Sequence, residues 1–153
     1  MIKKRINELL KMRNFISVAT CDFKGRPNAA PKFLLRCEDS TIYLVDYTIG
    51  RTWENLKMNP RVGLSFMDTE SLRGYQINGS VQILEKGAEY DDIVKELEQK
   101  EINLSTERII NAITTGKRHE SYELAIPKKF VIFKVSIEEA VEIGPSGVKR
   151  ESV

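Results

Sequence analysis

The chain has 153 residues, 41% of them hydrophobic, a length and composition that fit one globular domain with its own core. Its 24 basic and 22 acidic residues give a formal net charge of +2, so no bulk field draws it to nucleic acid or to a membrane. The sequence shows no membrane-spanning or secretory segment, and we expect a cytoplasmic protein whose two cysteines are reduced thiols. A single histidine and the lack of a paired-cysteine motif argue against a transition-metal site.

Hydrophobic periodicity predicts a mainly β chain that begins with a helix. Apolar residues recur at helical spacing over 2–12, and the period then changes to that of strands separated by turn residues. In chain order, strands are predicted over 15–21, 27–37, 41–45, 61–67, 74–84, 122–126 and 130–143, with a helix over 51–58. Gly79 lies inside the fifth of these strands, which indicates a bulge or a close approach of two backbones. Short strands in hairpin order favour an antiparallel barrel.

A helical insertion precedes the last two predicted strands. Residues 88–116 contain two apolar stripes, and we expect two helices that pack on the barrel beside the functional site. Ser105 fits the N-cap of the second helix and Gly116 fits its C′ position. The sequence therefore predicts a single domain over 1–143, and we expect 144–153 to be a loose tail.

The segment 45–62 carries the main functional signal, because it leads from a strand through a loop into a short helix. Unpaired N–H groups and the positive end of the helix dipole make such a helix start suitable for binding phosphate. Arg51 adds a charge there, Thr52 adds a hydroxyl group, and Gly50 lets a phosphate approach the backbone. Asn55, one turn further on, can donate another hydrogen bond. A solvated arginine and an ordinary helix cap would explain Arg51 and Thr52 without a ligand.

The residues around this segment resemble the FMN-binding split-barrel family that includes pyridoxamine 5′-phosphate oxidase. The resemblance covers most of the chain: a strand, glycine turn and strand over 15–31, the run Asn59-Pro60-Arg61-Val62, and a strand with an internal glycine over 74–81. It implies an antiparallel split β-barrel that binds FMN noncovalently and forms a homodimer with FMN at the subunit interface. It also implies a flavin-dependent oxidoreductase acting on a small molecule, with no catalytic side chain assigned because the flavin carries the chemistry.

The same resemblance gives roles to the residues of the loop and helix. Arg51 and Thr52 match positions that bind the FMN phosphate, and Asn55 can reach the phosphate or the ribityl chain. Asp46 and Tyr47 precede the loop, where relatives present side chains to the flavin, although a purely structural role explains them equally well. Asp46 would be repelled near flavin O2 or N1, so a ribityl hydroxyl or the flavin N3–H is its expected partner.

Two strands are expected to supply further cofactor contacts. In the second strand, small side chains let the backbone lie along the edge of the flavin ring, and these residues are Ala29, Ala30 and Pro31. Lys32 is either a solvated residue, a cation near the flavin N1–C2=O group, or a second contact to the phosphate. Gln76 and Asn78 share one face of their strand, which is either the solvent side or the side that contacts FMN of the partner subunit.

Oxidation of pyridoxamine phosphate itself is not expected. Relatives with that activity carry a tryptophan and an arginine beyond the last strand, whereas Trp53 is the only tryptophan here. Two alternatives to an FMN-dependent oxidoreductase stay open: a non-catalytic flavin carrier or sensor, and a reductase that holds a deazaflavin (F420) in the same groove.

Overall fold

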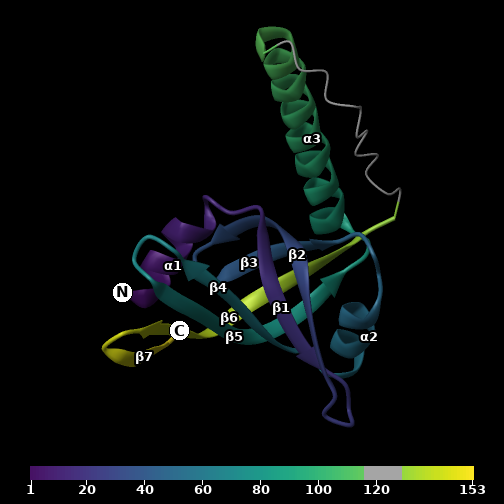
Figure 1. The fold of residues 1–153 in the computed structure, drawn as a ribbon. Coiled ribbons are helices and arrows are strands. Elements are labelled where there is room, and N and C mark those ends of the chain that lie inside the picture. The colour runs from purple at the N-terminus through teal and green to yellow at the C-terminus, as the bar shows by residue number, and fades with distance from the viewer. Residues whose placement is uncertain (116–128) are drawn as a thin grey trace. The chain divides into compact units, whose positions relative to one another are not determined.

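The structure, a computed structural model, describes residues 1–115 and 129–153 of a chain that divides into two compact units. The first unit consists of residues 1–84 and 129–153, and the second of residues 85–128. In chain order, the first unit contains α1 (Ile2–Leu10), β1 (Phe15–Cys21), β2 (Pro27–Glu38), β3 (Thr41–Asp46), α2 (Arg51–Met58), β4 (Arg61–Asp68), β5 (Arg73–Leu84), β6 (Val131–Gly144) and β7 (Gly147–Ser152), and the second contains α3 (Ala88–Thr115) (Figure 1). The predicted strand over 122–126 and the predicted C′ residue Gly116 lie outside the described residues.

Seven antiparallel strands form one sheet in the order β3-β2-β1-β4-β5-β6-β7. Residues 41–46 of β3 also pair with residues 131–136 of β6, so the first six strands of this order close into a barrel. β7 pairs with β6 as an additional strand outside the ring. The predicted mainly β, antiparallel barrel fold is therefore confirmed.

Side chains alternate between the barrel interior and the outer face, because successive residues of a strand point to opposite sides. On β1, for example, Ile16 and Val18 are buried while Ser17 and Ala19 are exposed. The helices of the first unit contribute to the same core, which includes Ile6, Leu10, Leu34, Ile42, Leu44, Leu56, Leu64, Ile77 and Phe133. One continuous core therefore supports both the barrel and the two short helices.

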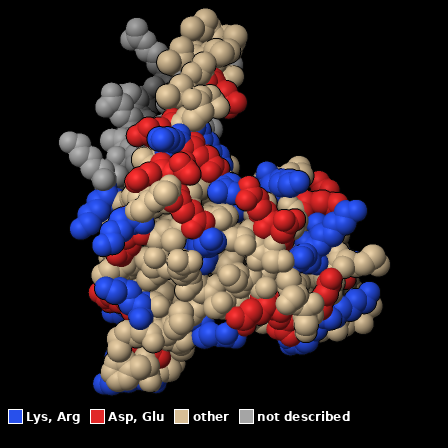
Figure 2. Space-filling view, turned by 180° about the vertical axis from the view of Figure 1, so that it is seen from behind, with Lys and Arg blue, Asp and Glu red and all other residues tan. Residues whose placement is uncertain are grey.

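The surface carries basic and acidic residues in close alternation. On the face seen in Figure 2, the two kinds are interspersed and neither gathers into one large patch. Some form ion pairs between neighbouring strands, such as Arg73 with Glu142 at 2.8 Å. Across the residues that the structure describes, no helix combines the length and the apolar character needed to cross a membrane.

β5 is distorted at Gly79, as the sequence predicts. The register between β5 and β6 shifts between Asn78 and Gly79. A Cβ atom placed on Gly79 would lie only 2.1 Å from the carbonyl oxygen of Ser136. Two backbones thus approach each other more closely than any side chain at this position would allow.

The inserted segment corrects one prediction, because α3 is a single helix of 28 residues where the sequence analysis expects two. The helix passes through Ser105 without interruption, and no glycine or proline occurs between its ends. The hydroxyl of Thr106, the next residue, donates to the carbonyl of Ile102 one turn earlier, as it would inside a continuous helix. The expected packing of this segment beside the functional site stays a prediction.

The C-terminal residues differ from the expected loose tail, because they form β7 and reach the start of α1. The carboxylate of Glu151 accepts hydrogen bonds from the Met1 ammonium group at 2.8 Å and from the backbone N–H groups of Ile2 at 2.5 Å and Lys3 at 3.2 Å. Met1 itself provides no side-chain cap for α1. Glu151 therefore satisfies N–H groups that the helix start leaves unpaired.

Gly79→Ala is expected to lower the free energy of unfolding by about 1–3 kcal/mol or more, the cost typical of overpacked sites. The reason is that the new methyl group meets backbone atoms of β6, which cannot move without breaking the ladder. Gly74→Ala is the matched control in the same strand, since its nearest neighbour would be Ile143 Cβ at an ordinary 3.7 Å. Urea unfolding measures both variants, and equal stabilities would contradict the prediction.

Glu151→Gln is expected to lower Tm at pH 7 but not in acid. Hydrogen bonds from the N-terminal ammonium group and then from the Lys3 N–H hold the pKa of Glu151 below its usual value of 4.5. A lowered pKa means that the ionised group stabilises the folded state above the unfolded-state pKa, and that this stabilisation disappears as pH falls through the folded-state pKa.

Thermal unfolding of both proteins between pH 7 and strongly acidic pH measures this effect. Glu8→Gln, a change to an exposed glutamate on α1, is the control and should leave the curve unchanged. A Tm difference for Glu151→Gln that is the same at every pH would show that ionisation of Glu151 is not its cause.

Candidate functional site

The start of α2 is an open, uncapped helix terminus at one end of the barrel. Among the described residues, no side chain caps the helix at its N-cap residue, Gly50. A Cβ atom on Gly50 would meet nothing within 4 Å, so the space beside this backbone is open. The helix ends at Met58 because Asn59, which precedes Pro60, is extended. The first-turn N–H groups of α2 are therefore available to an anion.

The polar residues of α2 divide between solvent and the barrel. Arg51 is exposed, whereas Thr52 and Asn55 are buried. Asn28 of β2 donates to the hydroxyl of Thr52 at 3.3 Å, and Asn55 donates to the hydroxyl of Thr20 at 3.1 Å. Thr52 and Asn55 thus hold the helix against β1 and β2, while Arg51 can turn toward a ligand at the helix start.

Lys32 and Asp46 form a buried ion pair between β2 and the end of β3. Lys32 is 7% exposed and Asp46 is 1% exposed, so Lys32 is not the solvated residue that one sequence interpretation allows. Lys32 Nζ lies 2.8 Å from Asp46 Oδ1 and 3.3 Å from the hydroxyl oxygen of Thr48. The hydroxyl and the N–H of Thr48 also donate to Asp46 Oδ1, at 2.9 and 3.2 Å. The pair therefore fixes the loop that leads to α2.

Tyr47 belongs to a row of aromatic rings beside this loop. Its ring centroid lies 6.4 Å from that of Phe33 and 5.9 Å from that of Phe130. Phe15, which is 60% exposed, continues the row at 5.8 Å from Phe33. These contacts give Tyr47 a packing role beside any contact that it makes with a ligand.

The outer face of the sheet carries two rows of small or uncharged residues. Strand pairing places the members of each row side by side across β2, β1, β4 and β5. The rows are Ala29, Ala19, Gly63 and Asn78, and Pro31, Ser17, Ser65 and Gln76. Gln76 donates to the side-chain oxygen of Asn78 at 3.0 Å, and Asn78 donates to Glu139 at 2.6 Å. Four of the predicted site residues thus share this face.

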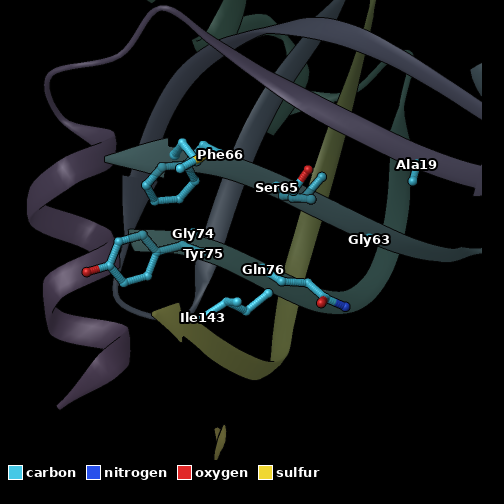
Figure 3. Close-up of a pocket in the computed structure, with 10 residues that line it drawn as sticks. Ala19, Gly63, Ser65, Phe66, Gly74, Tyr75, Gln76 and Ile143 are labelled. Carbon is cyan, nitrogen blue, oxygen red and sulfur yellow. The ribbon is translucent and has the colours of Figure 1, made fainter. Parts of the chain in front are cut away.

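A shallow hollow of about 550 Å³ lies on this outer face, over β4 and β5 (Figure 3). No charged residue occurs among its described lining residues, which include Ala19, Gly63, Ser65, Met67, Gln76 and Ile143. The rings of Phe66 and Tyr75 stack on the core side of the same two strands, with centroids 5.2 Å apart. Met67 and Ile143 are 53% and 44% exposed, so apolar surface borders the hollow. Such a surface is typical of a contact with another molecule.

The predicted site residues therefore fall into two groups. Strand alternation separates the inward-facing Lys32 from the exposed Ala29 and Pro31, and Ala30 is half-buried between them. Three residues outside the predicted set form hydrogen bonds with predicted site residues: Thr20, Asn28 and Thr48. Asn28 and Thr20 are directly paired across β1 and β2, which is the signal that could have found them. In the part of the chain that the structure describes, no group of three or more His, Cys, Asp or Glu residues is arranged to hold a metal ion.

The closed antiparallel ring with a helix start at its end is the architecture of split-barrel proteins. A family model described as pyridoxamine 5′-phosphate oxidase matches residues 2–143. The chain therefore belongs to the pyridoxamine 5′-phosphate oxidase family. No curated protein matches it.

Solved structures with the same fold include proteins of several names. HupZ of Group A Streptococcus is 26% identical over 97% of this chain and 98% of that chain, with a TM-score of 0.67. A pyridoxamine 5′-phosphate oxidase-related, FMN-binding protein from Nostoc punctiforme is 12% identical over 99% of this chain and 93% of that chain, with a TM-score of 0.56. An F420 reductase is 19% identical over 87% of this chain and 94% of that chain, also with a TM-score of 0.56.

A double-mutant cycle is expected to show strong coupling between Lys32 and Asp46. Lys32→Met leaves the buried carboxylate without its cation, and we expect a loss of about 3–5 kcal/mol of unfolding free energy. The double variant Lys32→Met/Asp46→Asn removes both charges and should recover most of this loss. Urea unfolding measures the cycle, and a double variant no more stable than the single one would contradict the assignment.

Proposed function

We propose that the protein is an FMN-dependent oxidoreductase in which the start of α2 binds the cofactor phosphate. The observation that carries this proposal is the uncapped helix start beside the exposed Arg51, in a chain of this family. First-turn N–H groups and the guanidinium of Arg51 would together hold a phosphate dianion. Likeness in fold to an FMN-binding protein supports the choice of ligand.

Two features of the helix start support a phosphate-bearing flavin as the ligand. The space beside Gly50 is open for a phosphate to approach the backbone. The hydroxyl of Thr52 is buried at the helix start and can serve as one donor. When bound, FMN supplies the hydride or electron transfer, and the residues of this chain orient it and set the electrostatic environment of its ring.

We also propose that two copies of the chain pair through the outer face of the sheet. The small residues of the two rows allow a second sheet to approach closely, and a two-fold interface needs such a self-complementary surface. The uncharged hollow with exposed Met67 and Ile143 supplies the apolar area. In this arrangement Gln76 and Asn78 would present their amides toward the cofactor of the partner subunit.

Two other functions suit the same site. A flavin carrier or sensor would bind FMN equally well, and it differs from an enzyme in that reduced nicotinamide would not reduce the bound flavin. A deazaflavin-dependent reductase is the second, and likeness in fold to an F420 reductase favours it as an alternative. That protein would bind the deazaflavin more tightly than FMN.

The protein is expected to bind FMN much more tightly than riboflavin, because only FMN offers a phosphate to α2. Arg51→Ala should weaken FMN binding by about 1.5–3 kcal/mol, the scale of a hydrogen bond to a charged group, and should leave riboflavin binding unchanged. Quenching of flavin fluorescence during titration measures both affinities.

Lys57→Ala is the matched control for Arg51→Ala. It removes the same charge from α2 but lies in the last turn, away from the helix start. Its FMN affinity should equal that of the unaltered protein. Equal binding of FMN and riboflavin by the unaltered protein would refute the phosphate site.

A further inference from the structure

The hydrogen bonds of Asp46 are distributed unevenly between its two carboxylate oxygens. Oδ1 accepts from Lys32 Nζ, from the Thr48 hydroxyl and from the Thr48 N–H. Oδ2 is buried and has no partner among the residues that the structure describes. A buried, ionised oxygen without a donor is costly, so a donor from outside this set of residues is to be expected there.

The surroundings limit what this donor can be. Three donors on Oδ1 fix the carboxylate, so it cannot rotate to share them with Oδ2. Exposure increases over the two residues after the buried Asp46, because Tyr47 is half-buried and Thr48 is exposed. Gly50 and the start of α2 follow directly. The orphaned oxygen thus lies at the end of β3, next to the loop that leads to the proposed phosphate site.

The chemistry of a carboxylate sets the class of partner. An ionised oxygen accepts only from N–H or O–H groups, and it repels a phosphate. A phosphate held at Arg51 therefore cannot be its partner. The non-phosphate part of a flavin offers two kinds of donor, the ring N3–H and the ribityl hydroxyls, and deazaflavins carry both as well.

We propose that Asp46 Oδ2 accepts a hydrogen bond from the ring N3–H or a ribityl hydroxyl of the bound flavin, and so recognises the cofactor apart from its phosphate. This inference rests on the proposed function. Lys32 balances the charge of Asp46, and Thr48 fixes its direction. Asp46 is then a specificity residue, because a ligand without the donor would leave the oxygen unpaired.

The experiment compares FMN and riboflavin binding by the unaltered protein and by Lys32→Met/Asp46→Asn, which keeps no unpaired buried charge. Asparagine at position 46 can still accept from Thr48 through its oxygen, but it places an amide NH₂ where Oδ2 was. We expect both ligands to bind about 10- to 100-fold more weakly, the fold-change that matches a lost hydrogen bond to a charged group. The ratio of FMN to riboflavin affinity should stay the same.

Two analogues identify the donor. Lumiflavin retains N3–H but lacks the ribityl chain, and 3-methylriboflavin retains the ribityl chain but lacks N3–H. If a ribityl hydroxyl is the donor, the double substitution no longer weakens lumiflavin binding; if N3–H is the donor, it no longer weakens 3-methylriboflavin binding. Lys32 can only donate, so sensitivity to a donor on the ligand identifies Asp46 rather than Lys32 as the contact.

Asp68→Asn is the control, since Asp68 is also a buried carboxylate but its hydrogen bonds are with Glu70 and Ser71. Its flavin affinities should equal those of the unaltered protein. The inference is overturned if the double variant binds FMN and riboflavin normally, if only FMN binding falls, or if the loss persists with both analogues. Failure of the unaltered protein to bind any flavin would instead overturn the proposed function.

Discussion

The pairing of β3 with β6 is the constraint on which the rest of the structure depends. It joins strands that are far apart in the sequence, and it turns an open sheet into a ring of six strands. Closure hides the edges that an open sheet would expose and lets interior side chains fill the small lumen. Asp46 is the last paired residue of β3, so closure also determines where the loop to α2 begins. The insertion between β5 and β6 can be long because these strands pair directly with each other.

The end of the ring near α2 contains buried polar residues, among them the ion pair of Lys32 and Asp46, which a purely structural core would not need. A buried ion pair is rarely more stabilising than apolar residues of the same size, so stability alone does not explain why this pair is present. β2 connects this polar region with the outer face, because its side chains alternate between Lys32 on one side and Ala29 and Pro31 on the other. In the function that we propose, a single strand therefore serves both cofactor binding and subunit contact.

The sequence predicts local features of this protein better than distant ones. The bounds of β1 and α2 agree with the predicted ranges 15–21 and 51–58, because alternation defines the first and Pro60 ends the second. The burial of Lys32 could not be predicted, since its partner Asp46 lies on another strand and lysine usually remains in solvent. β7 was missed for a similar reason: its composition is polar, and its contacts are with β6 and with the start of α1. The division of α3 into two helices followed from a capping signal that the helix does not use.

The contact of Glu151 with the first residues of the chain makes the connectivity of the barrel unit almost circular. Both ends of the chain meet at one carboxylate, so few residues would be needed to link them covalently. In such a circularly linked protein, new chain ends could be made at another loop without changing the order of the strands around the ring. The first unit is interrupted at a second place, between residues 84 and 129, and the two strands on either side of this interruption, β5 and β6, pair with each other. The fold is therefore defined by which strands pair around the ring, and not by the position at which the chain begins.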